Sequence, residues 1–172
     1  MTLTIHSDAS YLSRSRSRSV VGGIGYLGSR NAAIFATSSI LDVVVASAAE
    51  AEYAALFINA QHAEWTRTIQ TSLGHKQPAT LIICDNKCAV GLANDTLQIK
   101  RSKSIDMRFH WIRDRIRQGH FSVEWEAGAK NRADFFTKAL PGHVHQARMG
   151  SLVLTPCPSF RSQTRRHHTA SC

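Results

Sequence analysis

The segment "ATLIICDNKCAVGLAND" (Ala79–Asp95) decides the fold class of this chain. It begins with a continuous apolar run that an acidic residue, Asp85, closes. A run of this kind is typical of a strand covered on both faces, because a strand with one solvated face alternates apolar and polar residues. The residues after it, "NKCAVGLAND", predict a short helix. The segment therefore predicts a buried strand that leads directly into a helix.

Three further strands are predicted toward the N-terminus. They are the β-rich segments "LTIHSDAS" (3–10), "VVGGIGYLG" (20–28) and "AAIFATSSI" (32–40). A turn near Gly28–Asn31 joins the last two, and "RSRSRS" (14–19) between the first two is better interpreted as a hairpin loop than as a functional Arg/Ser element. Short turns of this kind favour an antiparallel meander.

A long helix is predicted between Ser47 and about Leu73. Its apolar residues recur at helical spacing, at Ala49, Tyr53, Leu56, Phe57 and Ala60. Ser47 is a suitable N-cap with Glu50 three residues on, as in a capping box, and Gly74 suits the end of the helix. Glu50 and Glu52 lie roughly 80° from the centre of the apolar stripe, on opposite sides, so helical geometry alone leaves both at its rim.

The remaining elements complete an α/β order. "SKSIDMRFHWIRDRIRQG" (102–119) predicts a helix that ends at Gly119, "HFSVEWEA" (120–127) a strand, and "NRADFFTKAL" (131–140) a final helix. Three strands, a helix, a strand, helices, a strand and a helix indicate an α/β domain with a mixed five-stranded sheet flanked by helices. We expect this domain to span residues 1–142, followed by a basic, disordered tail over 143–172.

The amino-acid composition indicates which class of binding partner to expect for this chain. The chain has 172 residues with 21 Lys and Arg against 12 Asp and Glu, a formal net charge of +9, which favours a polyanion such as nucleic acid. Its four cysteines form no CxxC pair, so we expect reduced thiols and an intracellular protein. The sequence has no apolar run of membrane-spanning length and no signal-peptide pattern, so we expect no membrane partner.

Acidic residues mark the ends of separate predicted elements. Asp8 lies near the end of the first strand, Asp85 ends the buried strand, and Asp134 lies in the first turn of the last helix. If the two strands are neighbours, their ends and a glutamate of the long helix bring four carboxylates together. Like charges so placed repel each other, and hard divalent cations such as Mg²⁺ relieve that repulsion. Taken singly, Asp8 suits a turn, Asp85 a helix cap and Asp134 a helix N-terminus.

Several motifs together resemble one known family. In chain order they include "ASAAEAEY", "CDN", "SKSIDMRFHWIRD" and "ADFFTKALP", over about residues 4–142. They resemble the ribonuclease H domain of copia-type LTR-retrotransposon polyproteins. The resemblance implies a ribonuclease H-like fold and an endoribonuclease that hydrolyses the RNA strand of RNA–DNA hybrids with two Mg²⁺ or Mn²⁺ ions. It also implies the reverse transcriptase portion of the same polyprotein as a partner, which in the family precedes the first strand, and a cytoplasmic location in virus-like particles or a nuclear one.

The same resemblance assigns the acidic set. Carried over by motif position, the catalytic and metal-binding residues are Asp8, Glu52, Asp85 and Asp134, because the family's glutamate is the second one in "EAEY". Glu50 is then left as the capping residue. Many cellular ribonucleases H carry a histidine before the last acid, whereas "EWEAGAKNRAD" (124–134) has none. The proton-transfer role is therefore unassigned, and position alone does not give it to Lys130.

Substrate contacts are expected beside the acids. A hybrid is recognised through its backbone and 2′-hydroxyls more than through base edges. The candidate contacts are Ser10, Asn86, Lys100, Arg101 and Lys103, with Arg108, Arg113, Arg115 and Arg117 on the helix that follows. We expect Trp65, Trp111 and Trp125 to be core residues and not stacking platforms.

Two other functions stay open at this level. One is a catalytically silent nucleic-acid-binding remnant of such an element, which the missing histidine favours. The other is a strand-transfer enzyme on the same fold, which is disfavoured because such enzymes end their acidic set with a glutamate and this chain offers Asp134.

Overall fold

The computed structural model describes residues 2–28, 33–97 and 106–152. Within these ranges the elements are β1 (Leu3–Arg14), β2 (Arg18–Leu27), β3 (Ala33–Ile40), α1 (Ala48–Ser72), β4 (Thr80–Cys84), α2 (Lys87–Ala93), α3 (Asp106–Arg117), β5 (Phe121–Trp125), the short 3₁₀ helix η1 (Gly128–Lys130), α4 (Asp134–Thr137) and α5 (Gly142–Leu152). The predicted order of strands and helices up to β5 is confirmed. No helix in the described part of the chain is long and apolar enough to cross a membrane.

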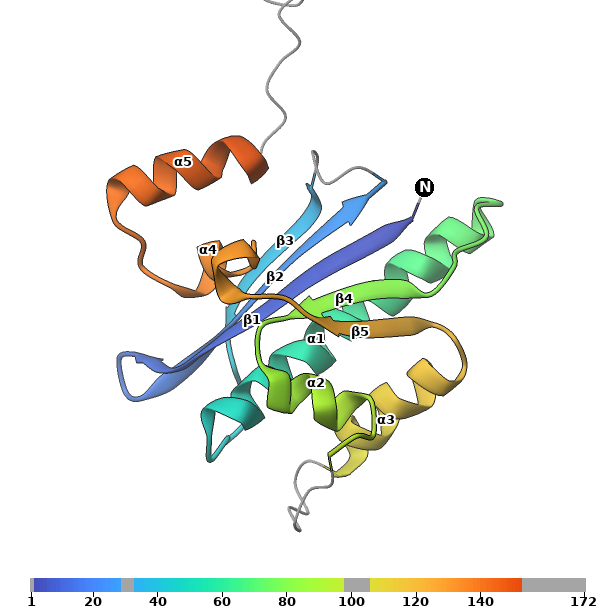
Figure 1. Ribbon diagram of the computed structural model, residues 1–172, viewed down its shortest axis with the longest axis horizontal. Coiled ribbons are helices and arrows are strands. Elements are labelled where there is room, and N and C mark those ends of the chain that lie inside the picture. Colours follow the sequence, from blue (N-terminus) through green and yellow to red (C-terminus); the bar gives the residue numbers. More distant parts are fainter. Residues whose placement is uncertain (1, 29–32, 98–105, 153–172) are drawn as a thin grey trace, which may run out of the picture.

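The five strands form one mixed sheet in the order β3-β2-β1-β4-β5 (Figure 1). β1 pairs antiparallel with β2 and parallel with β4, so the meander is joined to the buried strand through β1. β4 then pairs parallel with β5. The mixed sheet is as predicted, and β1 and β4 are neighbours, as the clustering of Asp8 and Asp85 requires. Asp8 lies in the middle of β1 and not near its end, because the strand continues to Arg14.

The hairpin between β1 and β2 contains the Arg/Ser run. The strands continue into this run, with Arg14 opposite Arg18, and only residues 15–17 form the turn. Arg16 and Ser17 have φ of 61° and 51°, a left-handed pair that suits a tight hairpin turn. The hairpin loop is confirmed, although β1 runs four residues past the predicted end at Ser10.

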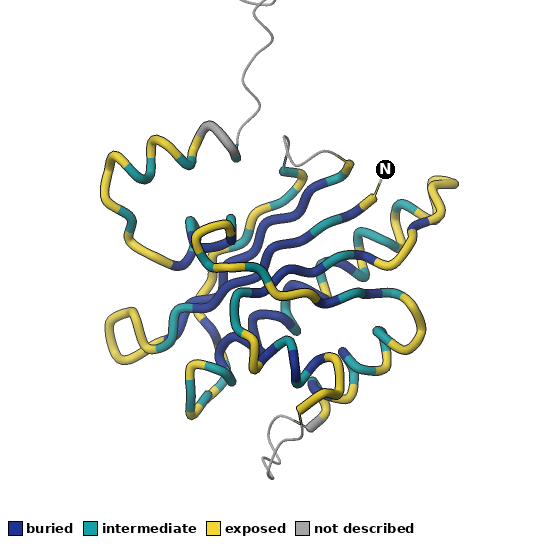
Figure 2. Tube along the Cα trace, in the orientation of Figure 1, coloured by how far each residue is buried: buried dark blue, intermediate teal, exposed yellow. Residues whose placement is uncertain are grey.

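α1 covers one face of the sheet and supplies much of the core. Ser47 caps it by accepting from the backbone N–H of Glu50, and Gly74 lies just past its end with φ of 86°. Tyr53 and Leu56 of α1 pack with Ile82 of β4 in a buried cluster that also takes in α2, α3 and β5. Figure 2 shows the buried segments running through the central strands and the adjoining side of α1.

Two adjacent glycines of β2 show that α1 and α4 lie on opposite faces of the sheet. A Cβ atom on Gly22 would meet Thr137 of α4, whereas a Cβ on Gly23 would meet Asn59 of α1 at 1.8 Å. Successive strand residues point to opposite faces. Asn59 is fully buried, and its Nδ2 donates to Ser7 Oγ at 2.9 Å and to Gly22 O at 3.0 Å. The absence of a side chain at Gly23 therefore allows α1 to approach the sheet.

Gly23→Ala is expected to lower the free energy of unfolding by about 1–3 kcal/mol or more, because the added methyl group overlaps Asn59 and breaks its hydrogen bonds. Gly142→Ala is the matched control, since a Cβ there has no atom within 4 Å. Urea denaturation of both variants measures the difference. Equal stability of the two would contradict the close contact between α1 and β2.

The C-terminal part of the domain differs from the sequence prediction. The predicted helix over 131–140 is a single turn, α4, and residues 142–152 form α5 where a tail without regular structure was predicted from residue 143. Asn131 Oδ1 accepts from the backbone N–H of Ala133. This local hydrogen bond favours a turn over residues 131–133, so the helix does not begin at Asn131 as predicted. α5 is held by contacts that the sequence pattern does not reveal, including the rings of Phe135 and His145 at 4.4 Å. Residues 153–172 lie outside the described part.

The prediction for the tryptophans is wrong in two of three cases. Trp65 is 71% exposed on the outer side of α1, and Trp125 is 46% exposed at the end of β5. Trp111 is partly buried and packs against the core. Trp65 belongs to the long helix but lies outside its apolar stripe. Trp125 is held at the surface because its indole Nε1 donates to Asp85 O at 2.9 Å.

Candidate active site

Four carboxylates from four separate elements meet where β4 ends. Asp8 comes from β1, Glu52 from the first two turns of α1, Asp85 from the residue after β4, and Asp134 from the first position of α4. Their ligand atoms form two groups, within each of which all atoms lie within 4.8 Å of one another. The Glu52 group consists of Glu52, Cys84 and Asp85, and the Asp8 group consists of Asp8, Asp85 and Asp134. Asp85 is shared by both groups.

The sheet register places the two aspartates of the strands. Ser7 of β1 lies opposite Cys84 of β4 in the parallel pair, so Asp8 and Asp85 follow at the same edge. Asp8 also lies opposite Gly22, on the face that α4 covers. Glu52 approaches from the α1 face. The site is therefore built where β4 stops and both faces of the sheet can contribute a side chain.

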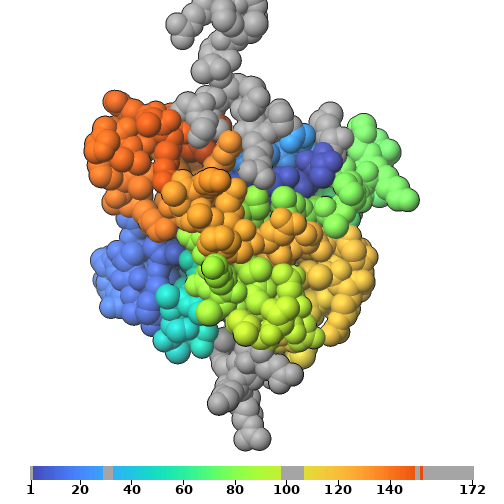
Figure 3. Space-filling model, in the orientation of Figure 1, coloured from blue at the N-terminus to red at the C-terminus, as the bar shows by residue number. Residues whose placement is uncertain are grey.

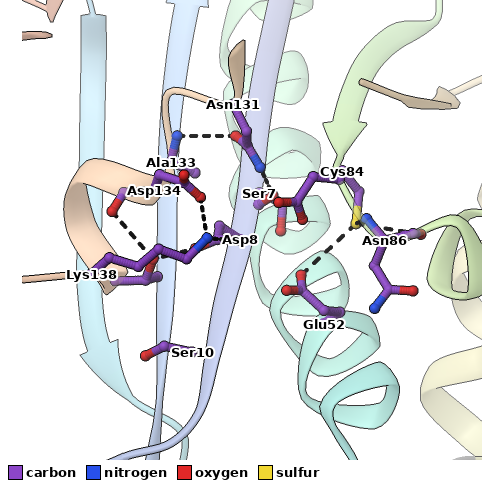
Figure 4. A network of polar contacts seen from close by, with 12 residues as sticks. Ser7, Asp8, Ser10, Glu52, Cys84, Asn86, Asn131, Ala133, Asp134 and Lys138 are labelled. Atoms are coloured by element: carbon purple, nitrogen blue, oxygen red, sulfur yellow. Dashed lines mark hydrogen bonds and ion pairs between the residues drawn. The ribbon is translucent and has the colours of Figure 1, made fainter. Parts of the chain in front are cut away.

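The structure separates the two glutamates of α1. Glu52 is only 7% exposed, and its Oε2 lies 3.9 Å from the thiol Sγ of Cys84 (Figure 4). Glu50 instead bonds back to the chain before the helix, where its Oε2 accepts from the backbone N–H of Ala46 at 2.7 Å. Glu52 therefore lies in the carboxylate cluster, and Glu50 belongs to the helix cap.

Neighbouring polar groups fix the positions of Asp8 and Asp134. Thr137 Oγ1 donates a short hydrogen bond to Asp8 Oδ2, which ties α4 to β1. Asn131 donates from Nδ2 to Ser7 O at 2.9 Å and accepts from Ala133 N at 3.0 Å, so one amide anchors the segment before α4 to β1 (Figure 4). In the space-filling view, the orange segment from β5 to α4 crosses the centre of the visible face (Figure 3).

Asp85 is held from the other side of the site. The indole of Trp125 binds its carbonyl, and a Cβ on Gly128 would lie 2.7 Å from its Oδ2. The backbone of η1 thus packs directly against the Asp85 carboxylate. Because a side chain at position 128 would displace that carboxylate, the glycine has a positioning role that spacing alone does not suggest.

Two cations contact the Asp8 group. Lys138 Nζ lies 2.6 Å from Asp134 Oδ1 and 3.7 Å from Asp8 Oδ1 (Figure 4). Arg148 of α5 reaches the other oxygen of Asp134, with Nη1 3.5 Å from Oδ2. Desolvation lowers the pKa of Lys138, but its ion pairs with Asp134 and Asp8 outweigh this and raise the pKa above its ordinary value. The lysine is therefore an ammonium ion at neutral pH.

Burial raises the pKa of three carboxyl groups in the site, those of Asp8, Glu52 and Asp85. Burial raises the pKa of Asp8 to about 6, although the hydrogen bond from Thr137 and the charge of Lys138 oppose the shift. Burial, with repulsion from Asp8 and Asp85, raises the pKa of Glu52 to about 9. Desolvation also raises the pKa of Asp85, and burial raises the pKa of the Cys84 thiol, which stays protonated beside Glu52. Folding has therefore brought carboxyl groups so close together, and buried them so far, that Glu52 stays protonated at neutral pH in the absence of a further cation.

The donor set fits divalent metal ions. Hard cations such as Mg²⁺ take carboxylate oxygens; the Asp8 group offers three carboxylates, and the Glu52 group offers two beside the Cys84 thiol. Asp8 Oδ1 is buried and accepts no hydrogen bond within the described residues, so it has a lone pair available for a ligand. The raised pKa values of Asp8 and Glu52 reflect the unfavourable free energy of ionising buried, neighbouring carboxyl groups. Bound divalent ions would offset that free energy.

The structure describes two of the five candidate substrate contacts, Ser10 and Asn86. Ser10 lies two residues along β1 from Asp8, and its Oγ bonds with Ser13 Oγ at 2.5 Å. Asn86 is the N-cap of α2, where its Oδ1 accepts from the N–H groups of Cys88 and Ala89, so its oxygen already has a structural role. Lys100, Arg101 and Lys103 lie outside the described residues.

Two of the four arginines of α3, Arg113 and Arg117, form ion pairs with Asp95. Arg113 pairs with Asp95, and its guanidinium also donates to the carbonyls of Leu92 and Leu97, so it ties α3 to the end of α2. Arg117 pairs with Asp95 at 3.5 Å. Of the two, Arg117 keeps an exposed side chain.

Sequence reasoning missed several residues that shape the site. Thr137 and Lys138 belong to the "FFTKAL" run, and the spacing of Lys138 four residues after Asp134 is the signal that would have found it. Asn131 and Gly128 act through the fold, and no local pattern marks them. Cys84 immediately precedes Asp85, but only the pairing of β4 beside α1 brings it to Glu52.

Comparison with known proteins identifies relatives in plants. The chain is 31% identical over 118 residues to a retrovirus-related Pol polyprotein from transposon TNT 1-94 of Nicotiana tabacum, a match that covers 68% of this chain and 9% of the relative. The matched part is thus a small fraction of that polyprotein. No family model matches the chain.

Comparison of structures identifies the fold. LC11-RNase H1, isolated from compost by a metagenomic approach, aligns with a TM-score of 0.60 at 15% identity over 79% of this chain and 92% of its own. The N-terminal RNase H domain of rv2228c from Mycobacterium tuberculosis aligns with a TM-score of 0.59 at 15% identity, over 87% and 97% of the two chains. The sheet order, the plant relatives and these neighbours agree with one another. The chain belongs to the ribonuclease H domains of copia-type retrotransposon polyproteins.

Proposed function

We propose that this domain is a metal-dependent endoribonuclease that hydrolyses the RNA strand of RNA–DNA hybrids. The observation that carries the proposal is the meeting of Asp8, Glu52, Asp85 and Asp134 at the end of β4 in two ligand groups that share Asp85. Solvated surface acids would repel and separate, whereas three of these four are buried. Such an arrangement is maintained at a cost to stability, which suggests selection for a site.

The roles of the residues follow from their positions. The Glu52 group and the Asp8 group would each hold one Mg²⁺ or Mn²⁺ ion. When bound, these ions supply Lewis-acid activation of a water and charge stabilisation at the leaving oxygen of an in-line phosphoryl displacement. Asn131 and Thr137 hold the backbone and carboxylates in place, and the packing of Gly128 and Trp125 fixes Asp85. The chain thus provides a rigid, pre-formed set of oxygen ligands.

The substrate part of the proposal is supported by charge and by a structural neighbour. The net charge of +9 favours a polyanion. A second structure of LC11-RNase H1 was solved in complex with an RNA/DNA hybrid, and it aligns with this chain with a TM-score of 0.59. The relative from Nicotiana tabacum is a Pol polyprotein, so we include the reverse transcriptase portion of such a polyprotein, and an intracellular location, in the proposal.

Cleavage of a labelled RNA–DNA hybrid tests this function. We expect hydrolysis of the RNA strand with Mg²⁺ or Mn²⁺ and none in excess EDTA. Asp85→Asn should lower the rate by more than about a hundredfold, because Asp85 belongs to both ligand groups and its loss weakens both. Circular dichroism would show that the variant is folded. Absence of metal-dependent cleavage by the wild-type protein, or equal rates for the two proteins, would refute the proposal.

A catalytically silent nucleic-acid-binding domain is the second candidate. It is favoured by the segment from Glu124 to Asp134, which contains no histidine to assist proton transfer. This candidate predicts binding of the hybrid that weakens steeply with salt, with no hydrolysis at any metal concentration. The cleavage assay and a binding assay in EDTA, run on the same preparation, separate the two candidates.

A further inference from the structure

Lys138 lies inside the carboxylate cluster and not beside it. It is the C-cap of α4, with φ of −110° and ψ of 139°, and its backbone N–H still donates to Asp134 O at 3.1 Å. The extended backbone lets the side chain fold back over α4. Its ammonium reaches Asp134 Oδ1 at 2.6 Å and Asp8 Oδ1 at 3.7 Å, and so joins α4 to β1.

The ion pairs of Lys138 are confined to one of the two ligand groups, although its charge also acts at longer range on Asp85 and Glu52. Both of its ion-pair partners, Asp8 and Asp134, belong to the Asp8 group, and neither belongs to the Glu52 group. Arg148 also contacts Asp134, but at Oδ2, the oxygen that Lys138 does not contact. Lys138 is therefore the cation that bridges two members of the Asp8 group, while Arg148 contacts one member from the side.

This places a positive charge where a metal ion would bind. Asp8 Oδ1 accepts no hydrogen bond within the described residues, and Lys138 Nζ is the charge that faces it. An ammonium and a divalent cation at the same carboxylates repel each other, and the oxygens cannot be fully shared. The Lys138 side chain is 43% exposed, so it can turn into solvent without loss of core packing.

We propose that Lys138 is an internal cation that occupies the Asp8 group, so that a divalent ion enters the Glu52 group first and enters the Asp8 group only by displacing Lys138. The inference rests on the proposed metal-dependent function. The second ion therefore binds more weakly than the first for two reasons. It is repelled by the first ion, and it must also break the ion pairs of Lys138 with Asp134 and Asp8. Lys138 thereby sets the metal concentration at which the site is complete.

Titration with Mn²⁺ tests the inference without any activity measurement. Free Mn²⁺ would be followed by electron paramagnetic resonance for the wild-type protein and for Lys138→Met. We expect Lys138→Met to tighten the weaker binding step by about tenfold or more, and to change the tighter step by less than about threefold. Lys138→Arg should keep the wild-type behaviour because it retains the charge.

Controls make the result specific to this position. Lys130→Met removes a lysine of η1 that has no ion pair to the four carboxylates among the described residues, and both of its binding steps should match the wild type. Lys138→Gln gives a second neutral variant if Lys138→Met folds poorly. Thermal melting should show the neutral variants less stable than wild type in EDTA and equal to it in saturating Mn²⁺.

The outcomes separate the two proposals. Unchanged binding in both neutral variants would overturn the role of Lys138 and leave the metal-dependent function intact. An equal shift of both steps would also overturn it, because a general change in charge would then explain the effect. Failure of every protein, including the wild type, to bind Mn²⁺ would overturn the metal site and with it the proposed function.

Discussion

Glu52→Gln is expected to lower the rate of hybrid hydrolysis by more than about a hundredfold, while Glu50→Gln leaves it within about twofold of wild type. The two substitutions make the same chemical change two residues apart on one helix. Glu52 lies in the carboxylate cluster, 3.9 Å from Cys84, whereas Glu50 binds the N–H of Ala46 at the cap. Only the first therefore removes a carboxylate from the proposed metal site.

Glu50→Gln should have a small effect on stability as well. A glutamine oxygen can accept the same hydrogen bond, and capping boxes use either residue, so we expect a loss of no more than about 0.5–1 kcal/mol. Initial rates on a labelled hybrid and urea denaturation measure the two effects. If Glu50→Gln were the inactive variant, the assignment of the metal-binding glutamate by its position in "EAEY" would be wrong.

The fold was predictable because its main elements have strong local signals. The apolar run that ends at Asp85 predicts β4, and the spacing of Tyr53, Leu56 and Ala60 predicts α1, whose cap at Ser47 is confirmed. The hairpin turn follows from the Arg/Ser run between two β-rich segments. In each case local preference and tertiary packing favour the same structure, so the sequence pattern is sufficient.

The burial of Glu52 was not predictable from the helix alone. Periodicity places Glu52 at the rim of the apolar stripe, where a side chain would be half solvated. It is buried because the start of α1 lies over the middle of β1 and the end of β4, where Ala9 and Cys84 contact its carboxylate. This is a long-range effect, and the resemblance of "EAEY" to a known motif chose between Glu50 and Glu52 before any packing was known.

The C-terminal elements α4 and α5 show where local sequence patterns are not sufficient to predict the structure. "NRADFFTKAL" has the composition of a helix, yet the side chain of Asn131 bonds to Ala133 N and the backbone of Lys138 is extended, so only one turn forms. The following segment lacks apolar periodicity, and α5 is nevertheless placed by Arg148 at Asp134 and by His145 at Phe135. In this part of the chain, polar contacts with residues of the site take the place of packing against the core. Such contacts do not recur at a regular spacing in the sequence, so no periodic pattern predicts them.

The same carboxylates predict how the metal-free protein responds to pH. The folded-state pKa values of Asp8 and Glu52, about 6 and about 9, lie above their ordinary values of 3.8 and 4.5. Both acids therefore bind protons more tightly when folded, so their contribution to stability is fully present below about pH 4 and is lost as pH rises through the folded values. For Asp8 the loss is on the order of 3 kcal/mol, and Glu52 adds to it up to about pH 9.

Urea denaturation in EDTA from pH 5 to pH 9 measures this loss. We expect the free energy of unfolding of the wild-type protein to fall across the range, and that of Glu52→Gln to fall less. At pH 5 the two should differ by no more than about 1 kcal/mol, because folded Glu52 is then protonated and resembles the amide, while Glu52 of the unfolded chain has begun to ionise. At pH 8 the variant should be the more stable by a few kcal/mol, on the order of the pKa shift that it removes. Glu50→Gln should follow the wild-type curve throughout.

Saturating Mg²⁺ should reverse that order at pH 8. Binding to the folded protein alone stabilises it by mass action, and the wild type retains the full ligand set while Glu52→Gln does not. A structural glutamate would behave otherwise, since its loss would destabilise the protein with or without metal. The same substitution that removes activity thus raises metal-free stability, as expected for a carboxylate kept buried for catalysis. Parallel pH curves for Glu52→Gln and wild type in EDTA would instead show that Glu52 is ionised and already balanced by the chain.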